Sequence, residues 1–323
     1  PRDRPPGLRA LRMPDLSAAS SQPDEQDGSD TLAASDDSSL SLPQQLVGVD
    51  LREANLSGAD LSGLNFSRAS LDGTQFVRAC LFRATMRRSL LEGADLYRAD
   101  LRRANLTAAR MSDVNASWAD LRLAKLTEAV LKRADLHGAR LRGADLQGAI
   151  APEADFHLAD LQAANLSGIN LAGADLRSAN LRRADLRGAN LHKCNLSGVD
   201  LRGADLGGAD VGLANLSGAI AANAELIGTD FTWTDLSDCD LRGVDASLAN
   251  FERANLLSAD LTEAIAIGAN FKLASLSEAT FLRANLLDVV LTGARLEGAR
   301  FGENKSVSAG MKLNFVTRGA VFE

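Results

Sequence analysis

Apolar residues return at every fifth position from Leu51 to Phe301, and no residue is inserted or deleted along that stretch. Of the 51 positions in this series, which we call Leu positions, 35 are Leu and 8 are Phe. Two residues before the Leu position, 38 of 51 residues are Ala, and the residue in between is Asp or Asn in 33 of 51 units. A repeat this strict predicts a solenoid, whose units bury apolar side chains only by stacking on their neighbours.

The five-residue period excludes the two commonest patterns. Apolar residues recur about every 3.6 positions in an amphipathic helix and every second position in a half-buried strand. If each unit instead forms one short extended segment and one turn, Ala184 and Leu186 point inward and Asp185 points outward. Four such units close a square coil, so equivalent residues of successive coils lie one inter-strand spacing from each other, roughly 4.8 Å.

Many units carry the sequence Ala-(Asp or Asn)-Leu without change, for example at 59–61, 104–106, 174–176, 184–186, 204–206 and 254–256. With this consensus, followed by two variable residues, the chain resembles the pentapeptide-repeat family over residues 49–303. The resemblance implies an all-β fold, a right-handed quadrilateral parallel β-helix of about thirteen coils and a rod roughly 60 Å long.

Residue types at the turns and in the interior fit a square coil. The second residue after the Leu position is Gly in 19 units, Gly188 among them, where a corner requires a positive φ. Phe231, Phe251 and Phe271 recur at the same place in three successive coils, which predicts an internal ladder of rings. Ala residues at the Leu positions 246 and 266 leave room for these rings on the adjoining side.

The repeat divides the chain into three parts. Residues 1–44 are rich in Ser, Asp, Gly and Pro and have eight acidic and four basic side chains, which predicts a disordered low-complexity tail without a secretory signal. Because the first residue is Pro1, the natural N-terminus is expected to lie upstream. Residues 45–303 form the predicted β-helix. Residues 304–323 are expected to be a C-terminal cap or the start of a missing segment, with Met311–Val316 as a strand over the open end.

Composition argues against a membrane protein and favours a reducing compartment. No apolar run approaches the length of roughly 18 residues that is needed to cross a bilayer. Cys194 and Cys239 point inward more than two coils apart, and Cys80 points outward, so no pair is placed for a disulfide. We therefore expect a soluble protein of the cytoplasm.

The sequence contains no catalytic or cofactor motif. It has three His, no cluster of Cys and no Gly-rich phosphate loop, so we expect no enzyme activity, no cofactor and no metal. His137 and His157 stack on one edge, but two ligands do not complete a metal site. One side carries a row of carboxylates, for which a role in the fold is preferred because the repeat places this residue type in every coil: Asp100, Asp120, Asp160, Asp200, Asp240 and Asp260.

Two outward-facing sets exceed what the repeat requires. The first is an arginine row on one corner, which either pairs with nearby Asp residues or docks an acidic partner: Arg102, Arg122, Arg142, Arg182, Arg202 and Arg242. The second is an apolar cluster near the C-terminal end, which is either a partner or self-association site or a set of ordinary exposed aliphatics: Ile227, Leu248, Ile265, Ile267 and Leu287.

Three functions follow from these features. The preferred one is a non-catalytic, rigid scaffold for an unidentified protein partner, with a homodimer through the C-terminal coils as one form of it. The family resemblance implies an alternative, imitation of duplex DNA and binding to DNA gyrase as in quinolone resistance. Such a rod needs on the order of 35 negative charges, whereas residues 46–304 hold 28 Lys plus Arg and 33 Asp plus Glu. The third is binding of an acidic partner or nucleic acid through the arginine row. The net charge of −7 and the lack of aromatic residues between the arginines argue against nucleic acid.

Overall fold

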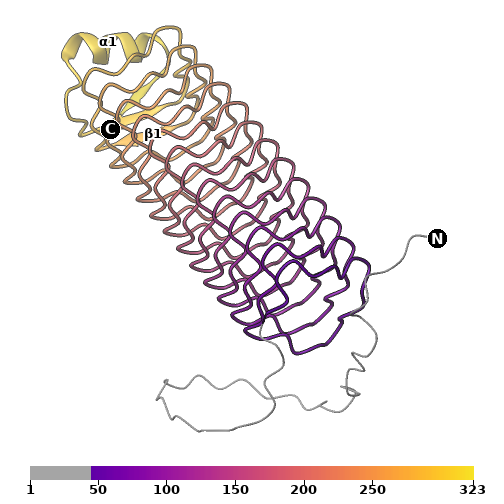
Figure 1. Ribbon diagram of the computed structural model, residues 1–323. Helices are drawn as coiled ribbons and strands as arrows, with labels where there is room; N and C mark the ends of the chain where they lie inside the picture. The colour runs from indigo at the N-terminus through magenta and orange to yellow at the C-terminus, as the bar shows by residue number, and fades with distance from the viewer. Residues whose placement is uncertain (1–44) are drawn as a thin grey trace, which may run out of the picture. The chain divides into compact units, whose positions relative to one another are not determined.

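The computed structural model describes residues 45–323, which wind into a rod of stacked square coils (Figure 1). The fold is a right-handed quadrilateral β-helix, as predicted. Each side of a coil contributes a single bridging residue to a parallel ladder, and the bridged partners are four units apart, as in Asn105 with Lys125. The predicted tail, residues 1–44, lies outside the described residues.

The bridging residues form four walls, which we name by their outward positions. Wall A contains residues 60, 80, 100 and so on, wall B contains 65, 85 and 105, wall C contains 50, 70 and 90, and wall D contains 55, 75 and 95. The two turn residues that follow each wall make a corner. The AB corner therefore contains 102–103, the BC corner 87–88, the CD corner 92–93 and the DA corner 97–98.

In the interior units that carry Asp or Asn, every main-chain N–H has a partner, which explains why this residue type recurs. In the unit 99–103, two N–H groups donate to carbonyls of the next coil, one to the previous coil and one to the carbonyl three residues earlier. The remaining donor, the N–H of Arg102, bonds Oδ1 of Asp100 at 3.1 Å. Because a buried or half-buried N–H is costly when unpaired, the acidic or amide side chain completes the corner.

All corners share one backbone conformation. The second residue after every Leu position has a φ between 50° and 71°, including the 19 Gly. The i to i+3 hydrogen bond and this positive φ at the third residue are those of a type II turn. The other 32 of the 51 positions are not Gly, and none of them is Val, Ile or Thr, for which a positive φ is most strained. The predicted glycine corners are confirmed.

The interior is packed along its whole length. The ring centroids of Phe231 and Phe251 lie 4.9 Å apart, and those of Phe251 and Phe271 lie 4.7 Å apart, with the planes of each pair within 2° of parallel. The predicted ladder is therefore confirmed. Polar side chains at the Ala position are also satisfied, as for Thr229, whose Oγ1 donates to the carbonyl of Leu206 in the previous coil at 2.8 Å.

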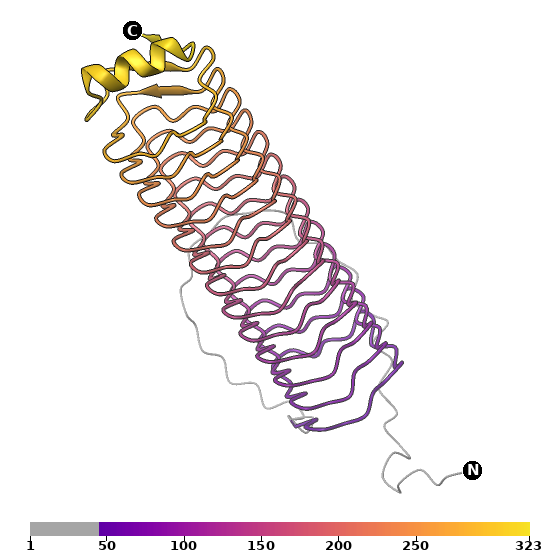
Figure 2. The same ribbon diagram turned by 90° about the horizontal axis from the view of Figure 1, so that it is seen from above.

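A short cap covers the C-terminal end. Strands β1 (Thr280–Leu282), β2 (Arg300–Gly302) and β3 (Val321–Phe322) pair in parallel, in that order, and helix α1 (Ala309–Thr317) lies across the end of the stack in both ribbon views (Figures 1 and 2). The expected strand at Met311–Val316 was wrong, because these residues lie within α1. The Ser308 side chain accepts the N–H of Met311 and starts the helix, and Phe315 packs 5.0 Å from Phe301.

Candidate interaction surfaces

The described residues offer no site for a metal ion: among 45–323, no group of three or more His, Cys, Asp or Glu side chains is placed to hold one. Residues 45–323 contain one helix, α1, and with nine residues it is too short to span a bilayer.

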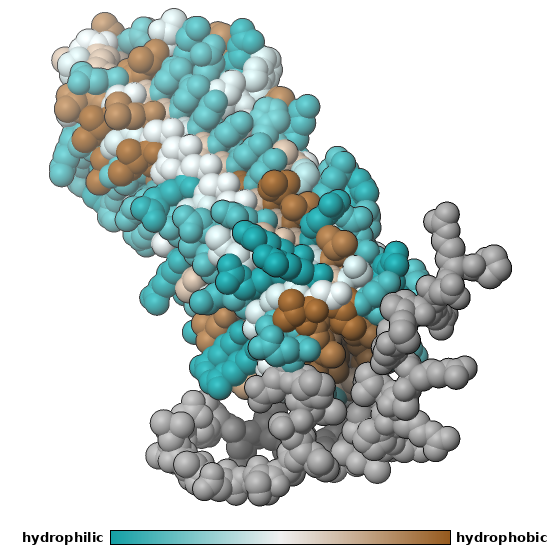
Figure 3. All heavy atoms as spheres, in the orientation of Figure 1, coloured by the Kyte–Doolittle hydropathy of each residue, from teal (hydrophilic) through white to brown (hydrophobic). Residues whose placement is uncertain are grey.

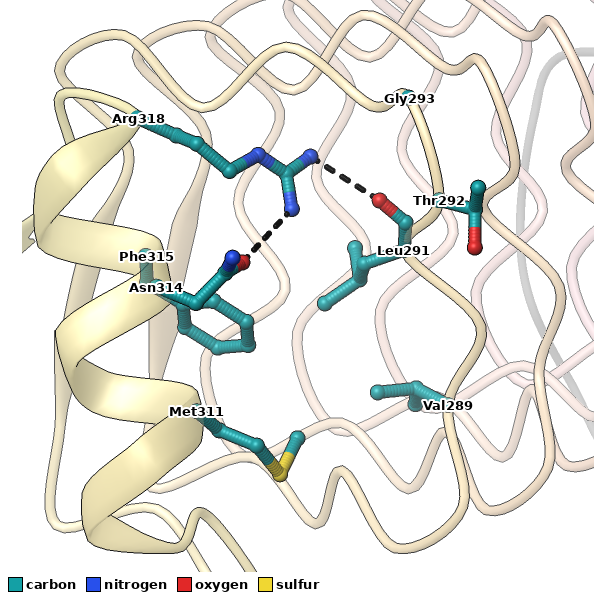
Figure 4. Close-up of a pocket in the computed structure, with 8 residues that line it drawn as sticks. All are labelled: Val289, Leu291, Thr292, Gly293, Met311, Asn314, Phe315 and Arg318. Atoms are coloured by element: carbon teal, nitrogen blue, oxygen red, sulfur yellow. Dashed lines mark hydrogen bonds between the residues drawn. The ribbon is translucent and has the colours of Figure 1, made fainter.

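The hollow beneath α1 serves to attach the cap. Phe315 points from the helix toward Leu291 and Met311 toward Val289, across the hollow (Figure 4). Nη2 of Arg318 donates to the carbonyl of Leu291 at 2.9 Å and to that of Ala294. Burial lowers the pKa of Arg318 without neutralising so basic a group. Arg318, which also donates to Oδ1 of Asn314, is thus engaged in holding the helix.

The row of carboxylates on wall A closes the corners. Each of the six Asp residues accepts the main-chain N–H two residues later, at 2.9 to 3.2 Å: Asp100, Asp120, Asp160, Asp200, Asp240 and Asp260. Where Asn follows Asp one coil later, its amide also donates to the carboxylate, as from Asn180 to Asp160 at 2.9 Å. These contacts agree with the preferred interpretation, in which the Asp row stabilises the corners of the fold.

The arginine row lies on the AB corner, and four of its six members already have an acidic partner. The guanidinium groups of Arg102, Arg122, Arg202 and Arg242 bind the Asp two residues before them at 2.5 to 2.7 Å. Hydrogen bonds from Arg202 lower the pKa of Asp200, against the effect of burial. Arg142 and Arg182 make no ion pair with any residue of 45–323, because positions 140 and 180 are Arg and Asn.

The two stacked histidines lie on the DA corner beside an aromatic residue that the sequence reasoning missed. Trp118 is half exposed, and its ring lies edge-on to His137 at 5.3 Å, which lies edge-on to His157 at 5.1 Å. The main-chain N–H groups of both histidines donate to Asp side chains on wall D. The sequence did hold a signal for this aromatic residue. Gly138 stands at the equivalent position one coil after Trp118, and its lack of a side chain makes room for the Trp118 ring.

The apolar cluster forms a continuous ridge on the BC corner, which we call the apolar ridge. Ile227, Leu248, Ile267 and Leu287 come from four consecutive coils, and Ile265 lies beside them on wall B. Leu248 is 69% exposed, Ile267 is half-buried and the other three are between 40% and 45% exposed. The main-chain N–H of Leu248 donates to the carbonyl of Ile267 at 2.8 Å, which shows how closely these coils stack.

A second exposed row, which we call the Trp ridge, runs along the CD corner of the same coils. It contains Leu213, Trp233 and Leu273, all 44% to 54% exposed, and Arg253 between them stacks its guanidinium 4.8 Å from the Trp233 ring centre. Wall C lies between the two ridges and carries a hydrogen-bonded Asn and Asp ladder, such as Asn270 to Asn250 at 2.9 Å. Hydrophobic patches separated by polar surface are also visible in Figure 3.

The cysteines belong to the core or the wall. Burial raises the pKa of Cys194 and of Cys239 to about 12, and each thiol donates to a main-chain carbonyl of the previous coil. Cys80 is half-buried on wall A, and all three are free. Thiols with so high a pKa are poor nucleophiles at neutral pH, so Cys194 and Cys239 serve packing.

The fold is a solenoid built from five-residue units. Its coils are square, an Asp or Asn side chain closes most corners, and Leu, Phe and Ala fill the interior. The sequence profile for pentapeptide repeats matches this chain in eight copies. These copies cover seven segments of the chain: 50–88, 84–122, 109–148, 154–192, 194–232, 234–272 and 269–303. The chain belongs to the pentapeptide-repeat family.

Solved structures of other pentapeptide-repeat proteins are similar. HetL, involved in heterocyst differentiation regulation in the cyanobacterium Nostoc sp. strain PCC 7120, is 33% identical over 67% of this chain and 89% of its own, with a TM-score of 0.38. A protein of the Arabidopsis thaliana thylakoid lumen is 27% identical over 42% of this chain and 80% of its own, with a TM-score of 0.30. QnrB1, a plasmid-mediated fluoroquinolone resistance protein, is 18% identical over 61% of this chain and 97% of its own, with a TM-score of 0.37. A comparison with curated proteins found no match.

Proposed function

We propose that the chain is a non-catalytic scaffold that binds protein through the apolar ridge. The observation that carries this proposal is the continuity of the ridge: four consecutive coils each place a large aliphatic side chain outward on the same corner. Repeat proteins commonly present such ordered rows to a partner. A contiguous apolar row is also the usual mark of an interaction surface, unlike aliphatics scattered singly.

The side chains of the ridge serve no need of the fold itself. The inward positions of these coils are filled independently, for example by Leu226, Ala246 and Ala266. Corners of the same type elsewhere carry Gly, Ser or Arg, as at 207–208 and 187–188. The neighbouring Trp ridge enlarges the surface on the other side of wall C. Both ridges stand on coils joined to their neighbours by regular main-chain hydrogen bonds, such as that from Trp233 to Glu252, so the surface is rigid and loses little conformational entropy on binding.

Self-association is the form of this proposal that is simplest to test. Light scattering on the full chain should give the mass of a dimer for the wild type and of a monomer when Ile227, Leu248, Ile267 and Leu287 are all changed to Ser. The matched control changes four exposed aliphatics outside the ridge to Ser: Leu123, Ile150, Leu158 and Ile220. The control should keep the wild-type mass. A wild type that is monomeric at all concentrations removes the homodimer and leaves only a different protein as partner.

Gyrase binding by imitation of DNA is the less favoured function. The arginine row places cations along the AB corner beside the Asp residues of wall A, so this side of the rod is not uniformly negative. Residues 62–126 of the AB and BC corners carry Arg where a DNA mimic requires carboxylates. An assay of gyrase supercoiling with the purified chain tests this alternative, and we expect no change in supercoiling.

A further inference from the structure

Positive charge on wall B and its two corners is concentrated in the first coils of the rod. In its first four coils, wall B and its two corners carry eight cationic side chains and one carboxylate, Glu128 at the far end: Arg68, Arg83, Arg87, Arg88, Arg102, Arg103, Arg122 and Lys125. We call these eight residues the basic patch. In later coils the outward residues of wall B are carboxylates in four consecutive coils, Asp185, Asp205, Glu225 and Asp245, and five arginines on the two corners leave that region nearly neutral.

The cations of the basic patch lie close together in successive coils. Main-chain hydrogen bonds join Arg68 to Arg87 at 2.9 Å, and Arg83 to Arg102 at 3.0 Å, across neighbouring coils. On wall B between them, Thr85 bridges to Asn105 and Asn105 to Lys125, so the face is flat and neutral apart from that lysine. Two corners with cationic side chains thus border one polar strip.

Six of the eight cations are not neutralised within the described part of the chain. Only Arg102 and Arg122 have an ion pair with a residue of 45–323, through Asp100 and Asp120 on wall A. Arg68, Arg83, Arg87, Arg88 and Arg103 are exposed, as is Lys125. Like charges at this spacing repel one another, so a partner that brings negative charge lowers the free energy of the patch.

We propose that the basic patch docks a short carboxylate-rich segment of a partner protein. Seven of its eight cations are Arg, whose planar fork binds carboxylates through two parallel hydrogen bonds. The chain itself shows this geometry at Arg102, whose Nε and Nη2 bind the two oxygens of Asp100 at 2.8 and 2.7 Å. A carboxylate of a partner finds the same donors on the unpaired arginines.

The length and the surroundings of the patch favour an acidic protein segment over nucleic acid. Four coils span only about 14 to 19 Å, and beyond them Asp145 and the four consecutive carboxylates offset the corner arginines, so no uniformly cationic track continues along the rod for an extended polyanion. Single-stranded nucleic acid also needs exposed rings on which bases stack. Phe82 is the aromatic residue of this surface, and Arg83 and Arg102 already cover it at 5.1 and 5.5 Å.

The site is distinct from the apolar ridge. Arg87 and Arg88 lie on the same BC corner as Ile227 but seven coils away along the rod. Loss of binding at one site therefore leaves the other intact, and a monomeric wild type has no bearing on the basic patch.

The experiment uses the full chain and a fluorescein-labelled oligo-glutamate about as long as the patch, followed by fluorescence anisotropy. We expect binding at about 50 mM salt that weakens by at least about tenfold at about 300 mM. Changing Arg68, Arg83, Arg87 and Arg88 to Gln should weaken it by about tenfold or more. The matched control removes four arginines from the same two corners in later coils: Arg182, Arg183, Arg187 and Arg202. It should bind as the wild type does.

Three results overturn the proposal. The first is no binding of oligo-glutamate at low salt by a chain whose melting temperature shows that it is folded. The second is equal binding by the patch variant and the control. The third is tighter binding of a labelled oligo-thymidylate of the same charge, which assigns the patch to nucleic acid.

Discussion

The carboxylate of Asp200 accepts two kinds of donor from Arg202: the main-chain N–H, 3.2 Å from Oδ1, and the guanidinium, whose Nε lies 2.9 Å from Oδ1 and whose Nη2 lies 2.5 Å from Oδ2. The first contact closes a corner of the coil, and the second joins two opposite charges on the surface. One side chain therefore has a structural and an electrostatic role that mutation can separate.

Changing Asp200 to Asn or to Ala separates these roles. Asn keeps an oxygen that accepts the N–H of Arg202, so we expect a loss of well under about 1 kcal/mol from the free energy of unfolding. Ala removes the acceptor and should cost about 1 to 2 kcal/mol. Urea denaturation of the three proteins measures both. Equal losses for Asn and Ala would contradict the role of the oxygen in closing the corner.

Acid should destabilise the rod through the paired aspartates. Hydrogen bonds from Arg202 and Arg242 lower the pKa of Asp200 and of Asp240 in the folded chain, and burial opposes them only in part. A carboxyl with a lowered folded pKa stabilises the fold above its unfolded pKa of about 3.9, and this is lost as the pH falls through the folded pKa. We expect a steady melting temperature from about pH 7 to 5 and a fall below about pH 4.

The double variant Asp200→Asn and Asp240→Asn tests that assignment. Its melting temperature should fall less between about pH 5 and 3 than that of the wild type, because two of the titrating carboxyls are gone. An identical fall in both proteins would place the acid sensitivity in other carboxyls.

Two pairs of substitutions test which members of the arginine row contribute to stability. Changing Arg122 and Arg202 to Gln breaks two ion pairs and should cost about 0.4 to 2 kcal/mol in total. Changing Arg142 and Arg182 to Gln removes as many charges but no ion pair with residues 45–323, so the melting temperature should stay within about 1 °C. A larger loss of stability from changing Arg142 and Arg182 than from changing Arg122 and Arg202 would show that the ion pairs with Asp are not what stabilises the row.

The same substitution at a buried and an exposed leucine tests the core. Leu186 is fully buried, and Leu186→Asp places an unpaired charge on the axis, so we expect loss of more than about 4 kcal/mol or failure to fold. Leu248 is 69% exposed, and Leu248→Asp should change the free energy of unfolding by less than about 1 kcal/mol. Circular dichroism should show little helix in either folded protein. Comparable effects at the two sites would be inconsistent with the direction of these side chains.

Much of this structure could be predicted from residue spacing, because each inward position recurs after a whole number of units. The stack of Phe231, Phe251 and Phe271 follows from their recurrence at one place in successive coils. The pairing of Arg102, and its absence at Arg142, follows from whether Asp stands two residues earlier. The scaffold, the ridge and the row as a docking surface remain predictions.

The cap could not be derived in this way, since the repeat ends before it. Met311 and Phe315 fit an alternating pattern as well as a helical one, and the N-cap by Ser308 together with packing of Phe315 on Phe301 decides for the helix. The basic patch was also missed, because it joins two corners and one wall, and a search along single rows of equivalent positions does not reveal it.

The strict coil length has a consequence for how such a chain can vary. A duplication or loss of four units lengthens or shortens the rod and leaves every surface feature on its own side. A change of one unit keeps the core pattern as well, since each unit fills the same kind of position, but it rotates everything beyond it by a quarter turn. Arg88 and Leu248 share a corner only because a whole number of coils, eight, separates them. Small insertions in this architecture would therefore redirect a binding surface without disturbing the fold that carries it.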